Sequence, residues 1–232
     1  MQSVEKVADG TLLMHFILTN PPTDNWNFIA GQFVNLQFMD EKNEEAWRSY
    51  SIASGPNEYD NPAEFDLLVR VGAEGFGVGT KHLMHMKVGE SLPVRGAYGR
   101  FVLPKELPKK IVMIATGTGI APMRSMIQTL KSQSYRGVVE LIYGGRTPSD
   151  IAYLDELATE SSITKTFCFS RTKDFGEYSE HSKHGRVTAH LPAPYIEARY
   201  YICGNGAMCA EVRGHYYAAG LTRKEVHTEL FY

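Results

Sequence analysis

The sequence predicts a two-domain protein of the β plus α/β class, in which an antiparallel β-barrel precedes a parallel α/β sheet. Three observations predict it. The first hundred residues consist of short strand-like runs separated by turn residues, and after them strand-like and helix-like runs alternate. Between these patterns, two prolines and a cluster of charges occupy residues 103–110, as domain connections often do. We therefore expect domains at residues 1–104 and 105–232.

The first half contains six strand-like runs. In the run 33–38, Val34, Leu36 and Phe38 fall on one face, and the turn residues 40–43 follow before the next run, which is typical of a hairpin. The other runs lie at residues 4–7, 12–18, 47–52, 65–71 and 91–94, with a helical interlude near 81–86. Their number and spacing predict a small six-stranded antiparallel barrel.

The second half alternates strand and helix. The apolar run 111–115 meets a glycine turn, and Met123, Met126, Ile127 and Leu130 then recur at helical spacing. The alternation continues through the runs 138–143, 151–158, 166–169 and 200–203 and a final helix with Met208, Val212, Tyr216 and Ala219. Repeated βα units predict a Rossmann-like parallel sheet flanked by helices.

Composition excludes several classes of function. A net charge of −2 over 232 residues offers no global field for nucleic acid or an anionic membrane. We find no apolar run long enough to span a bilayer and no signal-peptide pattern, so a cytoplasmic protein is expected. Three cysteines, Cys168, Cys203 and Cys209, are too few for a disulfide scaffold or an iron–sulfur cluster, and no metal site is expected. Redox chemistry would therefore need another cofactor.

A glycine-rich turn follows the first strand of the second half. It reads Thr116-Gly117-Thr118-Gly119-Ile120-Ala121-Pro122 and opens the amphipathic helix. Free backbone N–H groups and the positive helix end there suit a phosphate, glycines allow close approach, and Pro122 stands in the first turn, where a missing N–H costs little. Such turns are common and many bind nothing, but this one lies in the first βα unit of a parallel sheet.

Two segments of the first half together resemble a flavin site. They are Arg48-Ser49-Tyr50-Ser51 at a strand end and Gly77-Val78-Gly79-Thr80 at the start of a helical turn. The arginine and the helix start suit a pyrophosphate, Tyr50 offers a flat face, and Ser51 can hydrogen-bond a ring nitrogen. The alternative is a surface arginine beside a core tyrosine.

The whole chain resembles the ferredoxin–NADP(H) reductase superfamily, most closely its bacterial members. The motifs that carry the resemblance are residues 48–54, Gly77-x-Gly-Thr80, Gly96-Ala97-Tyr98-Gly99-Arg100-Phe101, residues 117–122 and Cys203-Gly204-Asn205. The resemblance implies an FAD-binding barrel and an NADP-binding sheet. It implies FAD contacts from Arg48, Ser49, Tyr50, Ser51, Val69, Gly77, Val78, Gly79, Thr80 and Phe231.

The C-terminus Glu229-Leu230-Phe231-Tyr232 is similar to that of bacterial members. There the penultimate ring stacks on the flavin until nicotinamide displaces it, which implies this role for Phe231, with Tyr232 closing the site. The resemblance also places Cys203 near the reacting carbon of nicotinamide, and Ser51 and Glu229 would orient the stack and assist proton movement. Alternatively, the two aromatic residues simply pin a C-terminal strand.

Coenzyme choice should depend on arginines that clamp the 2′-phosphate of NADP. Arg146 follows Gly145 after the second strand, Arg171 follows Ser170 after the third, and Arg186 lies in Gly185-Arg186-Val187-Thr188. The Ser-Arg step resembles NADP-dependent members, but Thr172 replaces their usual acid, which leaves NADH open. The expected NADP contacts are Thr116, Gly117, Thr118, Gly119, Pro122, Arg146, Ser170, Arg171, Arg186, Cys203, Gly204 and Asn205.

The function that the resemblance implies is an FAD-dependent reductase that moves electrons between NADPH and a separate one-electron carrier, ferredoxin or flavodoxin. A monomer is expected. The alternatives are an NAD(P)H:flavin reductase or diaphorase, an NADH-dependent reductase component of an oxygenase, and a non-catalytic electron-transfer subunit. A dehydrogenase for an organic alcohol is a further alternative, but no histidine or lysine constellation favours it.

Overall fold

The computed structural model describes residues 1–21, 26–71 and 77–231. The strands are β1 (Ser3–Ala8), β2 (Thr11–Ile17), β3 (Phe33–Met39), β4 (Glu45–Ser51), β5 (Glu64–Arg70), β6 (Val94–Tyr98), β7 (Lys110–Thr116), β8 (Val138–Gly145), β9 (Thr164–Phe169), β10 (Ser182–His184), β11 (Ala198–Asn205) and β12 (Val226–Phe231). The α-helices are α1 (Val78–His85), α2 (Ile120–Ser132), α3 (Leu154–Thr159) and α4 (Gly206–Ala218). Short 3-10 helices are η1 (Gly117–Gly119), η2 (Pro148–Asp150), η3 (Gly176–His181) and η4 (Val187–Ala189).

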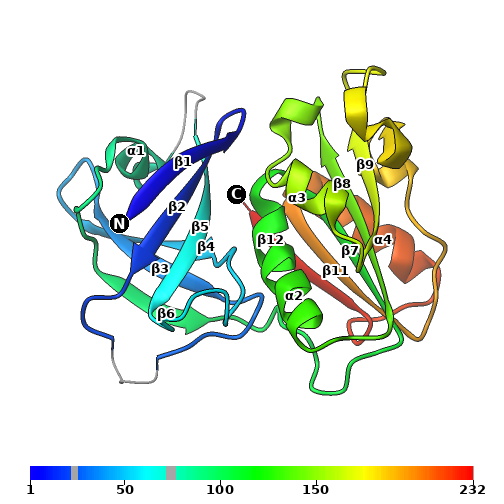
Figure 1. The fold of residues 1–232 in the computed structure, drawn as a ribbon, viewed down its shortest axis with the longest axis horizontal. Helices are drawn as coiled ribbons and strands as arrows, with labels where there is room; N and C mark the ends of the chain where they lie inside the picture. The colour runs from blue at the N-terminus through cyan, green and yellow to red at the C-terminus, as the bar shows by residue number, and fades with distance from the viewer. Residues whose placement is uncertain (22–25, 72–76, 232) are drawn as a thin grey trace. The chain divides into compact units, whose positions relative to one another are not determined.

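The chain divides into two compact units (Figure 1). The first unit contains residues 1–103 and 121–133, and the second contains residues 104–120 and 134–232. Most of helix α2 therefore groups with the first unit, although it follows the glycine-rich turn of the second.

The first unit is built on two three-stranded antiparallel sheets, ordered β1-β2-β5 and β4-β3-β6. An isolated bridge between Ile52 and Leu67 connects them. The expected hairpin is confirmed: β3 pairs with β4, and the carboxylate of Asp40 accepts two backbone hydrogen bonds in the turn. Side chains from both sheets share one core, whose largest fully buried members include Phe38, Phe65, Met14, Leu36, Ile52 and Leu67. This arrangement leaves the strand ends and α1 to carry polar groups.

The second unit is a six-stranded parallel sheet in the order β10-β9-β8-β7-β11-β12, and all of these strands except β10 are labelled in Figure 1. One of its two central strands, β7, carries the apolar run 111–115, all of it fully buried, as a strand covered on both faces requires. Helix α4 covers part of the sheet through Met208, Cys209, Val212 and Tyr216. Because all six strands are parallel, their carboxyl ends share one edge, which is where such sheets bind ligands.

Several element boundaries differ from expectation for local reasons. The strand expected at 91–94 begins only at Val94, because Pro93 has no N–H to donate to a ladder. The helix expected at 151–158 begins at Leu154, after Tyr153 adopts a left-handed conformation with φ of 59°. Strand β10 was not expected, and the C-terminal strand, expected only as an alternative, is present as β12.

No helix in the described residues is long and apolar enough to cross a membrane.

Candidate active site

Strand β4 and the first turn of α1 bring four of the expected flavin residues together. The ring of Tyr50 lies edge-on to Phe38, and its hydroxyl interacts with the side chain of Thr80. A Cβ on Gly79 would come within 2.5 Å of the Tyr50 hydroxyl and 3.2 Å of Arg48 Cγ. Glycine is therefore required for α1 to approach β4 this closely.

The chemistry of this corner suits a pyrophosphate. Helix α1 begins after Gly77, which has no side chain to cap it, so within the described residues no N-cap side chain accepts from the first N–H groups of the helix. Among the described residues, a Cβ on Gly77 would meet nothing within 4 Å. The exposed guanidinium of Arg48 donates one hydrogen bond to Trp47 O and retains further donors.

Several of the expected flavin-binding residues are buried, which determines their protonation and the atoms that a ligand could reach. Burial raises the pKa of Tyr50 to about 12, so its hydroxyl is neutral. Ser51 and Val69 are buried at the ends of β4 and β5, and Ser49 donates a hydrogen bond to Asn35. Val69 packs in the core of the first unit, so a ligand would meet its backbone and not its side chain.

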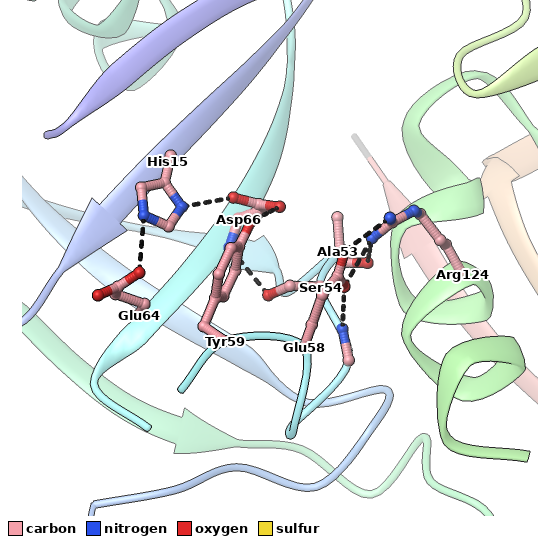
Figure 2. A network of polar contacts seen from close by, with 9 residues as sticks. His15, Ala53, Ser54, Glu58, Tyr59, Glu64, Asp66 and Arg124 are labelled. Carbon is pink, nitrogen blue, oxygen red and sulfur yellow. Dashed lines mark hydrogen bonds and ion pairs between the residues drawn. The ribbon is translucent and has the colours of Figure 1, made fainter. Parts of the chain in front are cut away.

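A polar network supports the segment that follows β4 (Figure 2). Arg124 of α2 donates to both carboxylate oxygens of Glu58, at 3.0 and 2.8 Å, and to Ala53 O at 3.1 Å. Glu58 also accepts the N–H of Gly55. The arginine is almost completely buried, so these contacts fix residues 53–58 directly after the flavin-type strand.

Asp66 is the second centre of the same network. Its carboxylate accepts hydrogen bonds from the hydroxyl of Tyr59 at 2.7 Å and from Nδ1 of His15 at 2.9 Å. Its backbone N–H donates to Ser54 Oγ, and its carbonyl accepts the N–H of Ala53. Figure 2 shows that Asp66 thereby ties β5 to the end of β4.

In the second unit, two glycine-containing turns interlock at the carboxyl edge of the sheet. Thr116 ends β7, and its hydroxyl accepts the N–H of Asn205, which ends the neighbouring strand β11. A Cβ on Gly119 would come within 2.3 Å of Cys203 O, and one on Gly204 within 2.3 Å of Thr116 Oγ1. Both positions require glycine because a side chain would collide with backbone atoms or with the half-buried Thr116, so the two turns are packed tightly against each other.

Hydrogen bonds and burial fix the same turns at the edge of the sheet. Gly117 adopts φ of +56° with open space in front of it, and its carbonyl accepts the hydroxyl of the buried Tyr143 at 2.9 Å. Asn205 caps α4 by accepting from Ala207 N and Met208 N. Thr118 lies half-buried in η1, and Pro122 lies buried in the first turn of α2, as expected for a residue without an N–H.

The C-terminal strand places the other expected residues beside these turns. In the β11–β12 pair, Cys203 aligns with Glu229 and Asn205 aligns with Phe231. Four residues from two distant parts of the sequence therefore share one strand end. Tyr232 lies outside the described residues.

All three cysteines are buried thiols. Cys203 is fully buried, and burial together with the carboxylate of Glu229 raises its pKa well above the ordinary value. Burial raises the pKa of Cys168 to about 12 and that of Cys209 to about 11. Cys209 donates weakly to the carbonyl of Glu229, as a packed small residue would. Among the described residues, no cluster of three or more His, Cys, Asp or Glu side chains could hold a metal ion.

The three expected arginines lie in one row at the same edge. Gly145, Phe169 and His184 align across β8, β9 and β10, and the arginines follow these positions by one or two residues. Neighbouring strands lie about 4.8 Å apart, so the row is about 10 Å wide. All three guanidinium groups are exposed, and none forms an ion pair within the described part of the chain. We call Arg146, Arg171 and Arg186 the arginine row.

Backbone contacts hold the row together. Ser170 N–H and Arg171 N–H donate to Gly145 O and Arg146 O, at 3.2 and 2.9 Å. Val187, next to Arg186, is buried, and a Cβ on Gly144 would come within 2.6 Å of its side chain. The loop after η3 and β10 is thus pinned against the end of β8.

Sequence reasoning missed the Arg124–Glu58 pair and the Asp66 network. The only available signal was a charged residue within the apolar stripe of α2, because Arg124 follows Met123 directly. Its partner lies 66 residues away, and no local pattern connects the two.

Comparisons with known proteins agree with this geometry. Residues 1–103 match the oxidoreductase FAD-binding domain family, and residues 113–214 match the oxidoreductase NAD-binding domain family. Ferredoxin–NADP reductase B of Sorangium cellulosum is 33% identical over 214 residues, which cover 88% of this chain and 85% of that protein. The electron transfer component of anthranilate 1,2-dioxygenase from Acinetobacter baylyi is 27% identical over 214 residues, 90% of this chain and 60% of that protein.

Among solved structures, a ferredoxin NADP⁺ reductase from Neisseria gonorrhoeae with bound FAD and NADP superimposes with a TM-score of 0.79 and 21% identity. The match covers 100% of this chain and 96% of that one, and it shows a common fold.

The fold and the two glycine-lined corners are those of a flavoprotein oxidoreductase with separate FAD-binding and NAD-binding halves. Within that class, the chain belongs to the ferredoxin–NADP reductase family. The family and the relatives named above imply an electron carrier as the partner.

Proposed function

We propose that this protein is an NADPH-dependent reductase that exchanges electrons with ferredoxin or flavodoxin as a separate, transiently bound carrier. Residues 1–104 form the FAD domain and residues 105–232 the NADP domain. The protein acts in the cytoplasm as a monomer. Electron-transfer encounters of this kind use small interfaces, so a stable complex is not needed.

The arginine row carries the choice of NADPH. The 2′-phosphate is the only group that distinguishes NADPH from NADH, and it adds about two negative charges at one point. Three exposed arginines that follow adjacent strand ends, which span about 10 Å, supply the positive charge for this phosphate. The position after Arg171 is occupied by Thr172 instead of the acidic residue usual in NADP-dependent members. Its hydroxyl accepts a hydrogen bond from the N–H of Asp174, and its side chain carries no negative charge that would repel the 2′-phosphate.

The end of β4 and the start of α1 supply the cofactor site of the first unit. Arg48 and the N–H groups of Gly77–Thr80 hold the pyrophosphate, and Tyr50, Ser49 and the backbone of Val69 hold the flavin end. When bound, FAD accepts a hydride and releases its electrons singly, which joins a two-electron donor to a one-electron carrier. Ser51, buried at the end of β4, orients the ring system by hydrogen bonding.

The strand end of β11 and β12 supplies the nicotinamide site. The turns at Thr116–Gly119 and Cys203–Asn205 bind the coenzyme backbone, with Pro122 shaping the start of α2. By resemblance to bacterial members of the family, we propose that Phe231, together with Tyr232, which lies outside the described residues, occupies the nicotinamide position until the coenzyme binds. Cys203 is fully buried, so we propose that movement of Phe231 uncovers it, while Glu229, its neighbour in the β11–β12 pair, assists proton movement.

A second candidate is the electron-transfer component of an oxygenase system. The relative from Acinetobacter baylyi carries that name, and Thr172 departs from the NADP-type pattern. This candidate shares the flavin chemistry and differs in coenzyme and partner. Coenzyme preference therefore separates the two.

The test is rapid-mixing reduction of the FAD-loaded protein by NADPH and NADH, with Arg146→Ala, Arg171→Ala and Arg186→Ala alongside the parent protein. Each loss of a charge-assisted contact, worth about 1.5–3 kcal/mol, is expected to raise the NADPH dissociation constant roughly tenfold or more and to spare NADH. Equal losses for both coenzymes would refute the phosphate clamp. A parent protein that prefers NADH would favour the oxygenase component.

A further inference from the structure

We infer that His184 and His190 are positioning residues for the arginine row, and that they set the preference for a 2′-phosphorylated coenzyme. This inference rests on the proposed NADPH function. Neither imidazole needs to touch the phosphate. Each one uses a ring nitrogen to fix the backbone beside an arginine.

The first contact ties the loop after β9 to strand β10. Nδ1 of His184 lies 2.8 Å from the carbonyl oxygen of Thr172, the residue that follows Arg171. A carbonyl only accepts, so Nδ1 carries the proton and donates it. The regular β9–β10 ladder ends with Phe169 and His184, and the imidazole thus holds a part of the loop that the ladder does not reach.

The second contact closes the turn that carries Arg186. Nε2 of His190 lies 2.8 Å from the carbonyl oxygen of His184 and therefore donates to it. The ring packs over Gly185, where a Cβ would come within 3.2 Å of Nε2 and where φ is +122°. Arg186 is the N-cap of the short helix η4, which begins at Val187 and continues the same turn.

Together with Arg171 N–H to Arg146 O, these contacts form one series across three loops. Each of the three arginines lies within two residues of a hydrogen bond in the series. A clamp for one phosphate group depends on the spacing of its donors, and binding is stronger when that spacing exists before the ligand arrives. Free loops would have to lose conformational entropy on binding.

The alternative is that both histidines only stabilise a surface turn. The two explanations predict different effects of substitution on folding and on nucleotide binding. Loss of a merely structural contact would weaken folding or affect all adenine nucleotides alike. Loss of a positioning contact would affect only ligands that carry the 2′-phosphate.

The experiment measures calorimetric binding of 2′,5′-ADP and of 5′-AMP to the FAD-loaded protein. His184→Ala removes the Nδ1 donor, whereas His184→Asn places an amide nitrogen at the same distance along the side chain. For the same reason His190→Leu is matched with His190→Gln, whose amide nitrogen corresponds to Nε2. His181→Ala is the control, because no hydrogen bond or ion pair of the described residues connects this η3 histidine to the arginine row, and thermal melting checks that each variant folds.

We expect His184→Ala and His190→Leu to weaken 2′,5′-ADP binding roughly five- to tenfold, which is the net worth of one hydrogen bond. The amide variants and His181→Ala should bind within about twofold of the parent protein, and 5′-AMP binding should not change. Unchanged 2′,5′-ADP binding in the Ala and Leu variants, or equal losses in the amide variants, would overturn the inference.

Arg171→Ala in the same assay separates this inference from the function on which it rests. If Arg171→Ala weakens 2′,5′-ADP binding and the histidine variants do not, only the positioning role is wrong. If Arg171→Ala also has no effect, the NADPH clamp itself is wrong and the positioning role is wrong with it.

Discussion

Arg124 and Glu58 form a two-pronged ion pair in which Nη1 lies 3.0 Å from Oε2 and Nη2 lies 2.8 Å from Oε1 (Figure 2). The Arg124 side chain is only 8% exposed, and Glu58 is 25% exposed. Breaking such a pair leaves a buried charge without its partner.

Glu58→Gln is therefore expected to lower the free energy of unfolding by about 2–3 kcal/mol, somewhat below the cost for a fully buried pair. Urea denaturation measures the change. The matched control is Glu41→Gln, which breaks the exposed pair between Glu41 and Lys81 and should cost less than about 1 kcal/mol. Equal changes in the free energy of unfolding would show that the buried pair stabilises the protein no more than the exposed pair does.

Gly119→Ala should disrupt the interlocked turns of the second unit, because the new methyl group would lie 2.3 Å from Cys203 O. We expect a loss of about 1–3 kcal/mol in stability and weaker binding of both coenzymes. Gly214→Ala in α4 is the control, since its Cβ meets nothing within 4 Å and alanine favours a helix by about 0.5–1 kcal/mol. The prediction is wrong if Gly119→Ala melts at the same temperature as the parent protein.

The raised pKa of Tyr50 predicts that the folded protein loses stability at alkaline pH. Burial raises its pKa from 10.0 to about 12, so the folded state holds its proton more tightly than the unfolded state. The contribution is complete below about pH 10 and disappears as pH rises towards about 12. Tyr50→Phe should flatten this part of the stability curve, measured by denaturation at several pH values. An unchanged slope in that variant would contradict the assignment to Tyr50.

The cysteines should resist alkylation in the folded protein. All three thiols are buried, and the pKa values of Cys168 and Cys209, about 12 and about 11, keep them protonated near neutral pH. Mass spectrometry after iodoacetamide treatment without coenzyme should find no label before denaturation and three labels after it. Rapid labelling of Cys203 in the folded chain would show that this thiol is accessible without displacement of Phe231.

Sequence periodicity predicted the two-part architecture because each element carries its own local pattern. Alternating residues in β3 and the continuous apolar run of β7 distinguish a sheet with one covered face from one buried on both faces. The glycine-rich turn at 117–119 could also be predicted, since glycine spacing after a strand is a local signal. The corresponding close approaches are present in the structure at Gly79, Gly119 and Gly204.

Contacts between distant segments could not be predicted in this way. The Arg124–Glu58 pair and the contact between His184 and Thr172 both depend on which elements become neighbours. Strand β10 has only three residues, too few for a recognisable alternation. The alignment of Phe231 with Asn205 likewise required the sheet order, which the sequence alone does not provide.

The most direct test of the central claim is an anaerobic titration of the purified chain with NADPH, following the flavin absorbance band. We predict that the protein retains FAD, that about one equivalent of NADPH bleaches the band, and that oxidised ferredoxin or flavodoxin restores it. NADH should act much more weakly. A protein that cannot hold added FAD, or whose bound flavin neither coenzyme reduces, would contradict the account.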